Sequence, residues 1–165
     1  GVRENEWNIS FNPFIPSEMD SVQLTVTING GLVLVDISGD GNTLSSVQFD
    51  EIEIPSAIVP NNMKSIKKIS LKLGETKSPY LKSVNAIVIS PKFDFKNRTL
   101  EFDLESFEDH IIELQIISPT EVENVLINGN SLSNGITESR KSNVHEINIS
   151  HKSELKRNHY SIKFK

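Results

Sequence analysis

The sequence predicts an all-β protein, an antiparallel β-sandwich, from its residue usage, its strict alternation and its turn chemistry. The chain holds 20 Ile and only 2 Ala among 165 residues. Ile is stiff at its branched β-carbon and fits a pleated sheet, whereas Ala is the best helix former. This usage favours strands over helices.

Apolar and polar residues alternate strictly in three segments, which are residues 22–28, 69–73 and 100–104. A period of two places every apolar side chain on one face of a strand, so each segment predicts a strand with one buried face. Residues 84–89 and 111–117 are more continuously apolar. That pattern predicts central strands that are covered on both faces.

Turn-forming residues separate these segments at regular intervals. Asn29-Gly30 stands between residues 22–28 and 32–37, which is the strongest short signal for a β-hairpin. The Gly-rich stretch 38–42 is predicted to close the next hairpin, and Asn128-Gly129 to form a turn after residues 125–127. About eleven strands at this spacing are typical of a sandwich.

The strands fall into two groups of similar length on either side of Ser78-Pro79. We expect residues 1–78 to form one β-sandwich module and residues 79–165 a second, each of the size of an immunoglobulin-like module. A single jelly-roll sandwich formed by the whole chain is the alternative. The only helical expectation is one turn within residues 151–158.

The C-terminal half carries a set of short motifs in a recognisable order. They are Lys96-Asn97-Arg98-Thr99-Leu100 at a strand entry, Pro119 after the next hairpin, and Ile127-Asn128-Gly129 at a turn. In this respect it resembles the immunoglobulin-like modules of archaeal and bacterial cell-surface and secreted proteins. Residues 106–109 depart from the Gly-rich turn of that pattern. The resemblance implies a surface or secreted structural module and assigns no site residues.

Composition excludes several classes of site. The chain has no Cys, so disulfides and Cys-ligated metals are absent, and no apolar run reaches the roughly 20 residues of a membrane span. It begins at Gly1 and not at Met, which we interpret as a processed or excised form. We expect an extracytoplasmic location, either secreted or at the cell surface, and no membrane insertion of this segment.

Charge is arranged in blocks. Residues 1–62 and 101–123 are acidic, with a net charge of −8 each, whereas residues 63–100 and 124–165 are basic, with +7 and +4. We interpret the blocks as strands of opposite charge that pair side by side. Nucleic acid is not expected as a partner, because the whole chain carries −5 and lacks an aromatic stacking motif.

One stretch resembles the first half of a calcium loop. Asp36, Asp40 and Asn42 place oxygen side chains at alternate positions with a Gly at the sixth. The twelfth position is Val47, where a bidentate Glu is expected. A Gly-rich hairpin turn explains the same residues, and we favour that interpretation over a metal site.

Three Asn-x-Ser/Thr sequons, at Asn8, Asn97 and Asn148, are candidates for glycosylation. Alternation places Asn8 and Asn148 on the outward faces of their strands. An Asn-rich composition also produces such triplets by chance.

No catalytic motif is present, and the four histidines lack the spacing of a zinc site. We therefore expect a non-catalytic module with a structural, assembly or ligand-binding role and no cofactor. Its partner is expected to be a protein or a carbohydrate at the cell surface. The alternative function is a carbohydrate-binding or accessory domain of a polysaccharide-active enzyme, which exposed aromatic side chains in one groove would favour.

Overall fold

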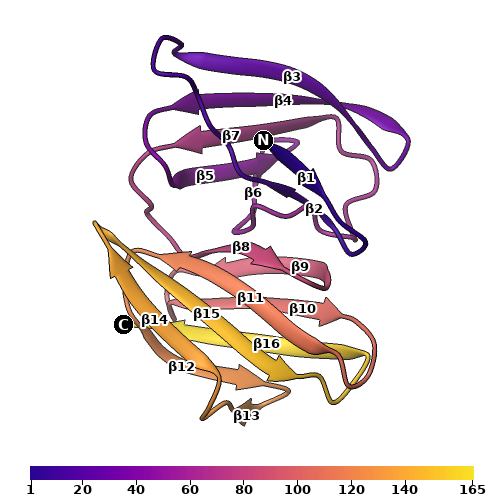
Figure 1. The fold of residues 1–165 in the computed structure, drawn as a ribbon, viewed down its shortest axis with the longest axis vertical. Helices are drawn as coiled ribbons and strands as arrows, with labels where there is room; N and C mark the ends of the chain where they lie inside the picture. The colour runs from indigo at the N-terminus through magenta and orange to yellow at the C-terminus, as the bar shows by residue number, and fades with distance from the viewer.

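Four β-sheets and no helix make up the protein in a computed structural model that describes residues 1–165 (Figure 1). This confirms the all-β prediction. Residues 153–156 form a bend where one helical turn was expected, because Ser153 and Asn158 bind the backbone of this segment through their side chains. The fold offers no helix with the length and apolarity needed to cross a bilayer.

The N-terminal half consists of one mixed sheet and a small hairpin that packs on it. The hairpin strands are β1 (Val2–Glu4) and β2 (Ile9–Phe11). The sheet has the strand order β3 (Ser21–Ile28), β4 (Gly31–Gly39), β7 (Lys68–Leu73), β5 (Leu44–Phe49) and β6 (Ile52–Glu53).

The C-terminal half consists of two antiparallel sheets that lie face to face (Figure 1). The four-stranded sheet has the order β14 (Ile136–Lys141), β15 (Val144–Lys152), β11 (Ile111–Ser118) and β8 (Tyr80–Val84). The five-stranded sheet has the order β13 (Asn130–Ser131), β12 (Val122–Ile127), β16 (Arg157–Phe164), β10 (Thr99–Glu105) and β9 (Ile87–Asp94).

Two hydrophobic clusters hold these layers together. One lies between the two C-terminal sheets, where Phe102 and Tyr160 stack with ring centroids 5.1 Å apart. The other lies beneath the N-terminal sheet, around Phe49 and Ile69. The finer prediction of two immunoglobulin-like modules in tandem stays a prediction.

The two halves share residues and backbone hydrogen bonds. Ile58 belongs to the C-terminal cluster, whereas Tyr80 and Ile117 belong to the N-terminal one. The amide of Ala57 donates to the Leu81 carbonyl at 2.8 Å. Packing therefore continues across the boundary between the two halves.

Of the three predicted turns, two are confirmed and one is wrong. Asn29-Gly30 joins β3 to β4 and Asn128-Gly129 joins β12 to β13, both with positive φ as a primed hairpin turn requires. The hairpin predicted across residues 38–42 is wrong, because β7 lies between β4 and β5. The three apolar residues of β7 are almost completely buried, and a central position in the sheet provides that burial.

The continuous strand predicted over residues 84–89 is also wrong. The chain leaves the four-stranded sheet after Val84, turns through Asn85-Ala86, and enters the five-stranded sheet as β9. By contrast, β11 is a central strand between β15 and β8, as its apolar sequence predicts.

Strands of opposite charge lie side by side, as the block pattern indicates. Acidic β10 lies between β9 and β16, and Lys92 pairs with Glu101 at 3.0 Å on one side. On the other side Arg157 pairs with Asp103 at 2.7 Å. Partial burial raises the pKa of Asp103, but hydrogen bonds from His159 and Arg157 outweigh it and leave that pKa below its ordinary value.

Candidate functional site

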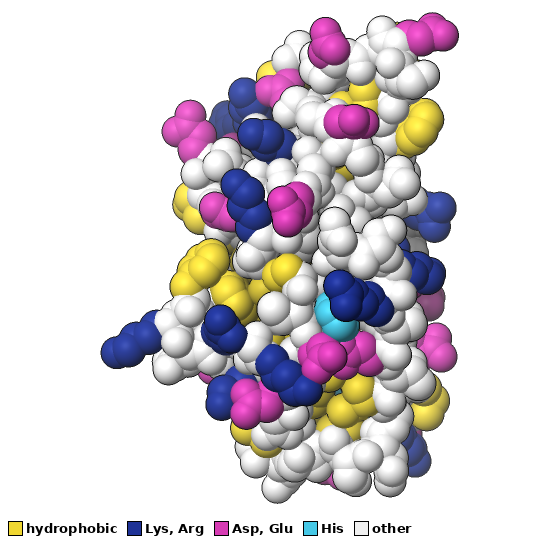
Figure 2. All heavy atoms as spheres, turned by 90° about the vertical axis from the view of Figure 1, so that its left-hand side faces the viewer, with side chains coloured by type: hydrophobic (Ala, Val, Ile, Leu, Met, Phe, Trp, Pro, Cys, Tyr) yellow, Lys and Arg dark blue, Asp and Glu magenta, His cyan; other side chains and the backbone are white.

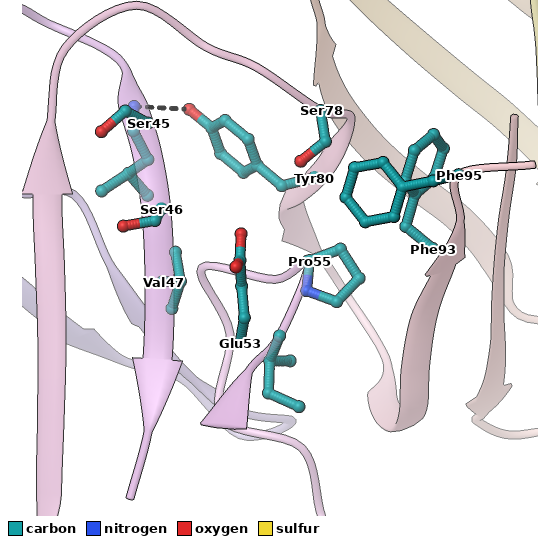
Figure 3. A pocket seen from close by; sticks show the side chains of 11 residues that line it. Ser45, Ser46, Val47, Glu53, Pro55, Ser78, Tyr80, Phe93 and Phe95 are labelled. Atoms are coloured by element: carbon teal, nitrogen blue, oxygen red, sulfur yellow. Dashed lines mark hydrogen bonds between the residues drawn. The ribbon is translucent and has the colours of Figure 1, made fainter. Parts of the chain in front are cut away.

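A cleft opens between the N-terminal sheet and the C-terminal sandwich, with an enclosed volume of about 100 Å³. Strands β5 and β6 line it from one side and the end of β9 from the other (Figure 3). We name it the aromatic cleft, and its lining residues are Leu44, Ser45, Ser46, Val47, Glu53, Ile54, Pro55, Ser78, Tyr80, Phe93 and Phe95.

Two phenylalanine rings form the wall on the C-terminal side. Phe93 and Phe95 meet edge to face with ring centroids 4.9 Å apart. The ring of Phe93 also packs against that of Phe164 in the core, with centroids 6.5 Å apart. Phe95 nevertheless remains 71% exposed. Hydrophobic side chains gather at the surface about midway along the molecule in Figure 2, on the side where the cleft opens.

The turn that carries Phe95 is fixed by hydrogen bonds to one carboxylate. Oδ1 of Asp94 accepts hydrogen bonds from the amides of Lys96 and Asn97, at 2.9 and 3.1 Å, and Oδ2 accepts one from the Asn97 side chain. The Asn97 amide, followed by the other donors, lowers the pKa of Asp94. These bonds fix the backbone that carries Phe95, and its ring has one aromatic contact, with Phe93, so part of the entropic cost of binding is already met.

Tyr80 begins β8 of the C-terminal half and reaches across to β5, whereas the N-terminal sheet contributes Ser45, Ser46 and Glu53. The Tyr80 hydroxyl accepts a hydrogen bond from the Leu44 amide at 3.4 Å, and burial raises the pKa of Tyr80 to about 12. Glu53 lies on β6 and is directed into the cleft between Val47 and Pro55 (Figure 3).

Glu53 is the only charged residue that lines the cleft, and it belongs to none of the ion pairs of the chain. The cleft thus combines apolar walls, three aromatic rings and one carboxylate without a cation. A cationic group on an apolar stem complements all three features, because its charge meets the carboxylate and its stem meets the rings.

A second hollow lies on the outer face of the four-stranded sheet. It is an open groove of about 640 Å³ in which amides and hydroxyls face solvent. One row crosses all four strands in register, from Ser83 through Gln115 and Asn148 to Thr137. We name it the amide groove. It contains no aromatic side chain.

The calcium candidates Asp36 and Asp40 each have other partners in the structure. Asp36 lies on the outer face of β4, where its carboxylate pairs with Lys68 at 2.8 Å and accepts a hydrogen bond from Gln23 at 2.6 Å. Asp40 lies in the following turn and accepts a hydrogen bond from the Gly41 amide. Asn42 is exposed in the same turn. No group of three or more His, Asp or Glu side chains is placed to hold a metal ion.

The three sequon asparagines lie in different surroundings. Asn8 is half-buried and donates to the carbonyls of Val84 and Ala86 at 2.8 and 2.9 Å. Asn97 is exposed in the turn next to Phe95, and Asn148 is exposed in the amide groove. Glycosylation at these positions stays a prediction.

Each histidine has its own partner, and none lines the aromatic cleft. The partners are Asn85 for His110, Glu138 for His145, Tyr160 for His151 and Asp103 for His159. Two of these pairs join a histidine to a carboxylate at 2.7 Å. They are cross-strand neighbours, so only the strand register could have revealed them.

Sequence reasoning missed the cleft, because Glu53, Tyr80 and Phe95 are far apart along the chain. A weak signal existed in Asp94-Phe95-Lys96-Asn97, where a large apolar residue occupies an Asx-type turn. A large apolar residue in such a turn, here Phe95, cannot reach the hydrophobic core and remains exposed. Comparisons with protein-family models, curated proteins and solved structures find no match to this chain.

Proposed function

We propose that the chain is a non-catalytic binding module of a secreted or cell-surface protein, and that its protein ligand inserts a Lys or Arg side chain into the aromatic cleft. The observation that carries this proposal is the unpaired carboxylate of Glu53 beside Phe93 and Phe95. The same proposal includes the immunoglobulin-like character of the C-terminal half, which two antiparallel sheets around one core support.

The chemistry of the cleft favours binding over catalysis. Its polar groups are serine hydroxyls, one phenol and one carboxylate, and no histidine, lysine or arginine lines it. Nucleophilic catalysis needs a nucleophile within reach of a base, and the Tyr80 phenol, whose pKa burial raises to about 12, is a poor nucleophile at neutral pH.

The expected strength follows from the two contacts. A cation over aromatic rings contributes about 0.5–2 kcal/mol, and an ion pair with the carboxylate of Glu53, which is exposed, about 0.2–1 kcal/mol. A single side chain therefore binds at about millimolar concentration or more weakly. Useful affinity requires further contacts between the ligand and the surface around the cleft.

Selection of peptides from a random phage-displayed library tests the proposal. Peptides selected on the wild-type protein should be enriched in Lys or Arg beside apolar residues. They should lose about two- to fivefold in affinity for Glu53→Gln and about two- to thirtyfold for Phe95→Ala. Phe14→Ala is the matched control, since Phe14 is 69% exposed and lies outside the cleft. Equal binding to all four proteins would overturn the proposal.

A neutral glycan is the second candidate, and the amide groove favours it. Asn, Gln, Ser and Thr side chains of the groove both donate and accept hydrogen bonds, as sugar hydroxyls require. The absence of an aromatic platform there weighs against strong binding. A glycan-array signal that Gln115→Ala abolishes and Phe95→Ala leaves intact would favour this candidate.

A further inference from the structure

Five of the six outer edges of the three large sheets are protected against pairing with another chain. Strands β6 and β13 are only two residues long, and β14 carries Glu138, Arg140 and Lys141. Short length and charge are two of the means by which proteins block exposed sheet edges.

The other two protected edges are covered by the chain itself. The backbone of residues 55–57 hydrogen-bonds to Leu81 on the free side of β8. On β9, the Asn61 amide donates to the Val88 carbonyl, and the Asn62 side chain accepts from the Ser90 amide at 3.0 Å. Only β3 is left without cover.

Strand β3 is long, regular and uncharged. Its sequence is Ser-Val-Gln-Leu-Thr-Val-Thr-Ile, and all eight residues pair with β4 without a bulge. None of the backbone hydrogen bonds outside the regular ladders reaches it. It forms the outermost strand of the N-terminal sheet, at the end of the molecule farthest from the C-terminal half (Figure 1).

The free side of β3 presents a defined set of backbone groups. In a hairpin with a two-residue turn, the residues next to the turn hydrogen-bond to each other, and this alternates along the strand. Ile28 therefore faces β4, and the backbone groups of Ser21, Gln23, Thr25 and Thr27 face outward. The apolar side chains of Val22, Leu24 and Val26 are only half-buried beneath this edge.

We propose that β3 pairs antiparallel with β3 of a second copy of this chain, across a two-fold axis at Thr25. This pairing joins the two N-terminal sheets into one continuous sheet. Leu24 then lies opposite Val26, and Val22 lies opposite Ile28, so apolar side chains meet on the core face. On the other face Gln23 lies opposite Thr27, and Thr25 opposite its own copy. Every outward backbone group of Gln23, Thr25 and Thr27 then finds a partner, whereas Ser21 lies opposite the turn residue Asn29.

The sequence of β3 is what favours a second copy over a different protein. A symmetric pair requires each residue to be compatible with its mirror position, and here apolar meets apolar and polar meets polar. No charged residue lies within the strand, so no like charges meet. Eight residues span about 27 Å, which gives a small interface of the weak class.

Sedimentation equilibrium over about 10 µM to 1 mM tests the pairing, a range suited to a weak interface. The apparent mass should rise from 18.5 kDa toward twice that value. Thr25→Pro removes an outward amide donor and Thr25→Lys adds charge at the edge, so each should weaken association at least about tenfold. Ser139→Lys, on the charged edge strand β14, is the control and should leave association unchanged.

Cysteine cross-linking tests the register of the β3–β3 pair. The chain has no Cys, so Thr25→Cys introduces a single thiol that should cross-link two copies with a short bis-maleimide reagent. Ser139→Cys should not cross-link above background. Wild-type protein that stays at 18.5 kDa up to 1 mM would overturn the proposal, and so would association that survives both Thr25→Pro and Thr25→Lys.

Discussion

The side chain of Asn8 ties the N-terminal hairpin to the C-terminal sandwich, and its removal should destabilise the protein measurably. Its amide nitrogen donates to the carbonyls of Val84 and Ala86 at 2.8 and 2.9 Å. These two carbonyls lie at the turn between β8 and β9, where the chain passes from one sheet to the other. Asn8→Ala leaves both acceptors in a half-buried site without this donor.

The magnitude follows from the two bonds. Each contributes about 0.5–1.5 kcal/mol, so Asn8→Ala should lower the free energy of unfolding by about 1–3 kcal/mol. A loss of about 2 kcal/mol corresponds to a decrease in Tm of about 4–8 °C for a chain of this size. Asn8→Asp should cost more than Asn8→Ala, because a carboxylate cannot donate and is repelled by both carbonyl oxygens.

Equilibrium unfolding in guanidinium chloride, followed by the fluorescence of Trp7 and by far-UV circular dichroism, measures the effect. Asn61→Ala is the control, since Asn61 is exposed and its side chain makes no hydrogen bond. It should stay within about 0.5 kcal/mol of wild type. If the free energy of unfolding of Asn8→Ala also lies within this margin, the two hydrogen bonds of Asn8 do not stabilise the contact between the halves.

Three further substitutions probe other parts of the fold. Tyr160→Phe removes the buried hydroxyl that lies 2.6 Å from Nε2 of His151, and thermal unfolding should show a loss of about 1–2 kcal/mol; an unchanged Tm would contradict this role. Gly135→Ala should lower the free energy of unfolding by about 2 kcal/mol or more, because Gly135 has φ +81° and a Cβ there meets a carbonyl oxygen of β15. Urea unfolding that gives the same stability as wild type would show that Ala is not strained at this position. The Lys68 ammonium lowers the pKa of Asp36 below its ordinary 3.8, so this carboxylate stabilises the fold above that pH and ceases to do so as the pH falls through the lowered pKa. Asp36→Asn should therefore lose less stability than wild type below pH 3.8, and identical acid-unfolding curves would contradict the assignment.

Local pattern was sufficient for the strands with strict alternation and for the turns between strands that are adjacent in both sequence and sheet. Asn29-Gly30 specifies its hairpin because both residues take up positive φ, and the alternation of residues 100–104 correctly placed Leu100, Phe102 and Leu104 in the core. In both cases the deciding interactions lie within a few residues of one another.

Long-range pairing was beyond local pattern. The stretch 38–42 has the composition of a hairpin turn, but the parallel insertion of β7 beside β4 depends on residues some thirty positions away. The aromatic cleft likewise forms only when β6 and the end of β9 meet. Its Glu53 and Phe95 are ordinary surface residues until the halves come together.

A nuclear magnetic resonance titration tests the binding role of the aromatic cleft most directly. We predict that N-acetyl-lysine amide or N-acetyl-arginine amide, added to ¹⁵N-labelled protein, shifts the amide resonances of Glu53, Ser78 and Phe95 at millimolar ligand. N-acetyl-leucine amide, which lacks the cation, should leave them in place, and so should either basic ligand added to Glu53→Gln. If the basic ligands shift no cleft resonance, or if Glu53→Gln responds as wild type does, the cleft is not the binding site that we propose.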